Sequence, residues 1–178
     1  MNDKLKKMEN FRLPRWKDIP DIGLYLDQIL SLIDNWLGDY LGFDGRRIMT
    51  KTMINNYVKQ GFIPAPVNKR YDRYAVGSLF IIALLKHIYQ MEEIYTLIHQ
   101  ATDGHDTEEF FDYFCETMEE AVRHAVNGTS MEKKIPARDS RGICWNVCNS
   151  VACQMYVKNL FLDNREQYRA GKEVQNKV

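Results

Sequence analysis

The chain has 178 residues, with 24 Lys and Arg against 24 Asp and Glu, so its formal net charge is zero. This balance weakens the simplest nucleic-acid hypothesis, a chain that is basic throughout, but it leaves room for a local basic face. The apolar content of 45% and the aromatic content of 12% exclude a disordered chain, and the length suits one full-sized domain or two small ones.

No segment of the chain is apolar for long enough to cross a membrane. The longest apolar run, LFIIALL at residues 79–85, ends at Lys86 and is well short of the ~18–20 residues that a bilayer requires. The charged N-terminus is followed by no apolar stretch of the kind that a secretory signal carries. We therefore expect a cytoplasmic protein with no membrane partner.

The four cysteines favour a reduced protein over one with disulfides or a bound metal. Cys144, Cys148 and Cys153 fall within ten residues that we expect to form one helix, where pairing is geometrically unfavourable. Cys115 lies apart from them. These thiols are best explained as small, partly buried side chains in a reducing compartment. No Cys or His spacing completes a set of four zinc ligands, so we predict no metal and no cofactor.

Residues 1–20 are polar, are broken by two prolines, and are predicted to form an N-terminal arm. Its apolar anchors on a core would be Phe11, Leu13 and Trp16. Asp21 then stands where a helix N-cap would, and apolar residues recur at spacings of three and four over residues 22–41. This pattern predicts an amphipathic helix that ends at Gly42.

A short helix is predicted after Thr50, which can cap it, and Gly61 ends it. The apolar face of this helix consists of Met53, Ile54, Tyr57 and Val58. Its other side carries Lys51, Thr52, Asn55, Asn56 and Lys59. A helix of about ten residues is marginal alone, so its neighbours must hold it in place.

Residues 62–74 contain two prolines and the pair Asn68-Lys69, which together disfavour a helix. Two short extended pieces joined by a turn fit better, with residues 62–63 and 70–74 as candidate strands. Helices are then predicted over residues 75–89, 92–100, 108–126 and 140–165. Asp106 and Glu109 form a candidate capping box for the third of these, and Gly128 would end it.

The zero net charge hides two opposed regions. Residues 46–74 contain seven basic residues and one acid, a net charge of +6, on the short helix and on the hairpin that follows. Residues 103–120 contain eight acids and no Lys or Arg, a net charge of −8. A charge run is usually a solvated face. The basic region can instead present one contiguous cationic surface of the kind that binds DNA.

Residues 53–63 (MINNYVKQGFI) resemble the second helix of the MerR-type winged helix-turn-helix, whose pattern is Thr-Leu-Arg-Tyr-Tyr, three variable positions and Gly-Leu. Residues 71–74 (YDRY) are similar to that family's Gly-Tyr-Arg-x-Tyr wing. The chain departs from the pattern at Asn55, Asn56 and Asp72, and two other helices replace the long dimerising coiled coil. Four further segments are LPRW at residues 13–16, LYLDQ at 24–28, KTMINNYVK at 51–59 and KRYDR at 69–73. With them, the chain resembles over about residues 10–160 the bacterial domain-of-unknown-function family 1836.

The resemblance to the MerR type implies a mainly α fold: a MerR-like winged helix-turn-helix with a small β-hairpin wing, followed by a C-terminal helical part. The expected organisation is an arm at residues 1–20, the winged helix-turn-helix at residues 21–101, and a helical region at residues 102–178 that packs on it. The implied function is that of a DNA-binding transcriptional regulator with double-stranded DNA as its partner.

In such a fold the recognition helix enters the major groove, where Asn can bond adenine and Thr can contact bases. The candidate base readers are therefore Thr52, Asn55 and Asn56. The candidate phosphate contacts on and before the helix are Arg47, Lys51 and Lys59. The candidate wing contacts to backbone or minor groove are Lys69, Arg70 and Arg73. The Asn pair has a structural alternative, as solvated amides or helix contacts, and the Tyr57 hydroxyl is either a phosphate contact or part of the core.

The alternative function is that of a non-enzymatic protein-interaction module that keeps the helix-turn-helix fold but does not bind DNA. An enzyme is not expected, because no nucleophile–base set, Gly-rich phosphate loop or metal cluster stands out. Reading a two-fold site favours a homodimer. The aromatic-rich C-terminal helices are most simply core, or else line a small-molecule effector pocket or a dimer interface. The acidic segment could approach the basic face of its own or a partner chain and compete with DNA.

Overall fold

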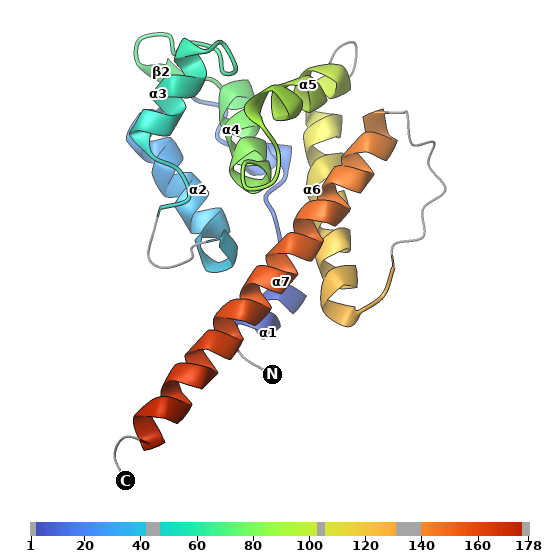
Figure 1. The fold of residues 1–178 in the computed structure, drawn as a ribbon. Helices are drawn as coiled ribbons and strands as arrows, with labels where there is room; N and C mark the ends of the chain where they lie inside the picture. The colour runs from blue at the N-terminus through green and yellow to red at the C-terminus, as the bar shows by residue number, and fades with distance from the viewer. Residues whose placement is uncertain (1–2, 42–46, 103–105, 131–139, 176–178) are drawn as a thin grey trace.

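The computed structural model describes residues 3–41, 47–102, 106–130 and 140–175, which form seven α-helices and one two-stranded sheet (Figure 1). In chain order, the helices and strands are α1 (Asp3–Glu9), β1 (Leu24–Tyr25), α2 (Leu26–Leu41), α3 (Lys51–Lys59), β2 (Arg70–Tyr71), α4 (Arg73–Leu85), α5 (Met91–Thr102), α6 (Thr107–Asn127) and α7 (Ser140–Gln175). A single 3-10 turn, Trp16–Asp18, lies in the arm. The predicted mainly helical fold with a small sheet is confirmed.

Helix α4 is the centre of the core. Every residue from Ala75 to Leu85 is buried, as expected of a helix that is apolar on all sides. An aromatic row crosses it: Trp36 of α2 packs edge-on against Phe80, and Phe80 packs against Phe111 of α6. Buried side chains of the arm, of residues 21–101 and of the C-terminal helices all belong to one hydrophobic cluster. The predicted division of the chain into three regions stays a prediction.

The N-terminal arm is anchored on this core, as the sequence predicts. Phe11 and Leu13 are buried, and Trp16 packs against Phe111. The arm crosses α4 closely, because a Cβ placed on Gly77 would lie 2.9 Å from the Trp16 ring. Its first residues form α1, which the sequence analysis does not predict; α1 packs on α6 and α7.

The chain around residue 21 differs from the prediction. Asp21 caps no helix, because Leu24–Tyr25 is extended and pairs with β2, so that α2 begins only at Leu26. Ile22 and Tyr25, predicted to lie on the buried helix face, are instead exposed. The predicted end of this helix at Gly42 lies outside the described residues.

The wing also differs from the predicted hairpin. Residues 62–63 form no strand, and β2 pairs antiparallel with β1, with Leu24 opposite Tyr71 and Tyr25 opposite Arg70. Arg73 and Tyr74 are helical, because the side chain of Asp72 accepts a hydrogen bond from the Ala75 amide and caps α4. The tight turn at Asn68-Lys69 is present.

The remaining helices follow the predictions with shifted ends. Asp106 caps α6, but its side chain accepts from the Glu108 amide, and Glu109 pairs with Arg141 of α7, so the predicted reciprocal capping box is not seen. Gly128 ends α6 with φ of 64°, as predicted. Helix α7 is longer than predicted, and its C-terminal half projects away from the other helices (Figure 1).

The cysteines are all free, and three of them lie on α7. Burial raises the pKa of Cys115 and of Cys148, which keeps both as thiols. The described residues contain no group of three or more His, Cys, Asp or Glu side chains placed to hold a metal. Within the same ranges, no helix has the length and apolar character needed to span a membrane.

The close crossing at Gly77 predicts the effect of adding one methyl group. In Gly77→Ala the new Cβ would overlap the Trp16 ring, a rigid group, and overpacking outweighs the better helix propensity of Ala. We expect a loss of about 1 kcal/mol of stability in thermal or urea unfolding. Gly38→Ala on α2 is the matched control: no atom lies within 4 Å of its Cβ position, so we expect a gain of about 0.5–1 kcal/mol. Equal effects of the two substitutions would contradict the crossing.

Candidate nucleic-acid interface

Helix α3 is short and is held at its start and on one face. The Thr50 hydroxyl accepts a hydrogen bond from the Met53 amide at 3.2 Å, which caps the first turn. Ile54 is fully buried, and its neighbours on the same face are half-buried. Tyr57 is half-buried and packs against the core, and this burial raises the pKa of its hydroxyl.

The opposite face of α3 is exposed and polar. It carries Lys51, Thr52, Asn55, Asn56 and Lys59. Within the described residues, the side chains of Thr52, Asn55, Asn56 and Lys59 make no hydrogen bond or ion pair. The structure therefore brings all three candidate base readers and one candidate phosphate contact to one free surface.

Lys51 is the exception on this face. Its ammonium lies 2.7 Å from a carboxylate oxygen of Asp27, in the first turn of α2. Both side chains are exposed, so this ion pair is weak and screened by salt. Asp27 is nonetheless an anion beside the proposed phosphate contact, which sequence reasoning missed because it lies 24 positions earlier in the chain.

A two-residue turn follows α3 in the chain and links Val67 to Arg70 by two reciprocal backbone hydrogen bonds of 2.9 Å. The turn and the start of α3 both contact the segment around β1, because Arg70 lies over Tyr25 and Lys51 pairs with Asp27. Asn68 and Lys69 at its tip have φ of 49° and 65°, the left-handed conformation that such a tight turn requires. Lys69 is exposed and has no ion-pair partner among the described residues.

The two arginines that follow the turn have partners in the N-terminal segment. Arg70 donates a hydrogen bond to the Gly23 carbonyl at 3.1 Å, and its guanidinium lies over the Tyr25 ring at 4.5 Å. The guanidinium of Arg73, on the first residue of α4, lies over Trp16, and its Nε is 3.6 Å from Asp21. Arg70 is exposed beside the turn, whereas Arg73 is three-quarters buried against the arm.

Arg47 is exposed before α3, near the segment that contains Arg46, which lies outside the described residues. Nine residues separate α2 from α3, more than the three or four of a compact helix-turn-helix, and five of them lie outside the described ranges. The structure thus gathers Lys51, Thr52, Asn55, Asn56 and Lys59 on one helix, with Lys69 and Arg70 on the neighbouring turn. We call these seven residues the basic surface.

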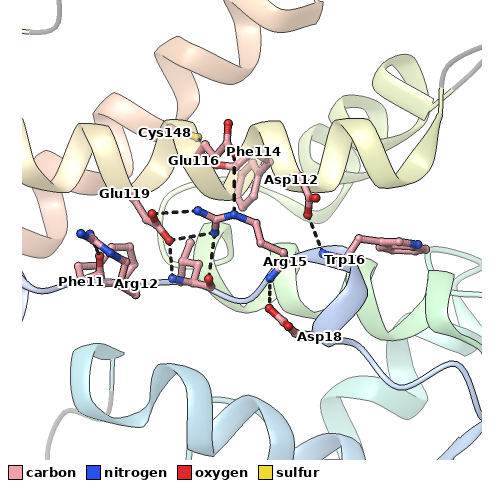
Figure 2. A network of polar contacts seen from close by, with 11 residues as sticks. Phe11, Arg12, Arg15, Trp16, Asp18, Asp112, Phe114, Glu116, Glu119 and Cys148 are labelled. Carbon is pink, nitrogen blue, oxygen red and sulfur yellow. Dashed lines mark hydrogen bonds and ion pairs between the residues drawn. The ribbon is translucent and has the colours of Figure 1, made fainter.

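The acidic segment contacts the arm rather than the basic surface (Figure 2). Glu119 of α6 is buried and accepts hydrogen bonds from the Leu13 amide at 2.7 Å and from both terminal nitrogens of Arg15, which raises the pKa of Arg15. Asp112 accepts from the Trp16 amide at 2.6 Å. These two carboxylates therefore bind the arm and do not approach the basic surface of their own chain, contrary to the hypothesis drawn from the charge pattern.

The comparison with family models decides the relationship of the chain. The model of a domain of unknown function, DUF1836, matches residues 14–120. The chain belongs to this family. The DUF1836 match contains the arm from Pro14, the sheet, α2 to α5 and two thirds of α6, and so includes the whole basic surface. Comparisons with curated proteins and with solved structures gave no match.

The turn supplies a test that separates stability from charge. Lys69→Gly removes the cost of a left-handed side-chain-bearing residue and leaves Asn-Gly, the preferred pair for this turn, so we expect about 0.5–1 kcal/mol of added stability. Lys59→Gly removes the same charge from the last residue of α3, where Gly disfavours the helical backbone, and should lower stability rather than raise it. Thermal unfolding of both variants checks the signs. A destabilised Lys69→Gly variant would mean that the turn is not as described.

Proposed function

We propose that the protein is a cytoplasmic, non-enzymatic DNA-binding regulator whose basic surface meets double-stranded DNA. The observation that carries the proposal is the free polar face of α3: two amides, a hydroxyl and an ammonium group lie on one capped helix without partners among the described residues. Protein surfaces that read base edges need such groups on a firmly held helix. The adjacent turn adds two cations, as a wing does.

The residues have distinct roles in this proposal. Thr52, Asn55 and Asn56 meet base edges in the major groove. Arg47, Lys51 and Lys59 contact phosphates, with Lys51 first released by Asp27. Lys69 and Arg70 on the turn contact backbone or minor groove. Arg73 keeps its place against Trp16 and contributes positive potential from behind the surface.

The first test is a fluorescence anisotropy titration of the full chain with mixed-sequence duplex at ~50 mM salt, where non-specific binding is strongest. Lys59→Gln and Lys69→Gln should each weaken binding on every sequence and lower the slope of log affinity against log salt by about 1. Arg123→Gln, an exposed cation of α6 away from the basic surface, removes the same charge and should leave the slope unchanged. Equal slopes for all three variants would contradict these phosphate contacts.

A protein-interaction module is the second candidate, and one observation favours it. Three of the five exposed large apolar side chains of the described residues lie on or beside the sheet and turn: Ile22, Tyr25 and Val67, of which Val67 is 75% exposed. Such a cluster is typical of a surface that meets another protein. Absence of DNA binding in the titration at low salt would favour this function over the regulator.

A homodimer belongs to the proposal, because a helix-turn-helix protein reads two half-sites as a dimer. Helix α7 offers a surface for it: Val157 and Phe161 are exposed and lie four residues apart, so they share one face of this helix.

Phe161→Ser should therefore shift the molecular mass measured by light scattering from two chains to one. Ile22→Ser is a matched control, because Ile22 and Phe161 are 69% and 68% exposed but lie at different places. A monomeric parent protein, or a dimer that survives Phe161→Ser, would contradict this interface.

A further inference from the structure

A second feature lies away from the basic surface, a cavity of about 450 Å³ between α5 and α7 at the end of α4. Its walls are apolar: Leu85, Tyr89, Ile94, Leu97, Ile143 and Val147. The volume falls within the range of pockets that hold small organic molecules. The Tyr89 hydroxyl is hydrogen-bonded to the Ser150 hydroxyl at 2.6 Å, so Tyr89 presents only its apolar ring to the cavity.

The charged groups that line this cavity are both acidic. Glu92 and Glu93 line it, together with Thr96 and Gln100, and none of its lining residues in the described part of the chain is Lys or Arg. Neither carboxylate forms an ion pair within the described residues. Both side chains are exposed. One oxygen of Glu93 accepts a hydrogen bond from the Gln90 amide before α5, whereas the Glu92 carboxylate has no hydrogen bond within the described residues.

We infer that this cavity binds a small amphipathic cation, with the apolar body against the walls and an ammonium or guanidinium group beside Glu92. Apolar burial supplies affinity, and the carboxylates select the charge of the ligand. An anion of the same shape would meet two carboxylates without compensation, and a neutral molecule would gain only the apolar part.

Helix α5 also connects the cavity to the basic surface. Ile94, Thr96 and Leu97 line the cavity, whereas the Tyr95 ring contacts Phe62, two residues after the C-cap of α3, with ring centroids 5.6 Å apart. A cation that shifts α5 would shift Phe62 and the end of α3 with it. This second step rests on the proposed function, and the occupancy of the cavity does not.

The test is calorimetric titration of the full chain with three probes of one chain length: octylammonium, octanol and octanoate. We expect saturable binding in the order octylammonium, octanol, octanoate, with the first preferred over the second by about fivefold at low salt. Glu92→Gln should remove most of that preference and leave octanol binding unchanged. Glu108→Gln, another exposed carboxylate in the first turn of a helix, lies outside the cavity and should change nothing.

A second variant keeps the test independent of charge. Val147→Phe narrows the cavity and should weaken binding of both octylammonium and octanol, with folding checked by thermal unfolding. No saturable binding, equal affinity for the three probes, or affinities left unchanged by Val147→Phe would overturn the inference. Dissociation of a dimer by Val147→Phe would also overturn the inference, because a second copy of the chain would then occupy the cavity.

The link to DNA is measured last, as the ratio of DNA affinities with and without octylammonium. Binding of octylammonium without binding of DNA would support the ligand site and contradict the proposed function. Binding of DNA without binding of octylammonium would support the proposed function and contradict the ligand site.

Discussion

The position of the N-terminal arm depends on one buried carboxylate. Glu119 is only 6% exposed, and a charge removed from water to that extent must be paired and hydrogen-bonded. Arg15 and the Leu13 amide meet that need, and in doing so they fix the arm along α6 (Figure 2). The arm then leads through the Trp16 crossing to β1, and β1 is the strand that pairs with β2. The turn of the basic surface is thus held from a point on the far side of the core.

This dependence explains why the two charged regions have different fates. Three carboxylates of α6 hold the arm: Glu119, Asp112 and, through a longer pair with Arg15, Glu116. The cations of the basic surface make few contacts. Lys51 and Arg70 have partners, whereas Lys59 and Lys69 are exposed and have none in the described part of the chain. A run of one charge sign is therefore structural in one case and free for binding in the other.

The sequence predicted the helices well because their signals are local. The cap at Thr50 acts over three residues and the cap at Asp106 over two, and apolar spacing acts over one or two turns, so α3 and α6 follow from nearby residues alone. The sheet could not be predicted in this way. Its two strands are two residues long and lie 45 positions apart, and the apolar pattern around Ile22 fits a helix equally well. The polar face of α3 was predictable from its spacing, whereas the partners of Arg73 and Lys51 lie in distant segments.

The packing of α6 on α7 bears on where a folding unit of this family ends. The family match stops at residue 120, which is inside α6 and one residue after the carboxylate that holds the arm. Beyond that point, Ala121 and Val122 remain buried, and the Cys148 thiol of α7 lies against the Phe114 carbonyl. A chain cut at the family boundary would keep every residue of the basic surface and would expose the apolar side of α6. The stretch that the family model matches and the stretch that can bury its own core are therefore different parts of the chain.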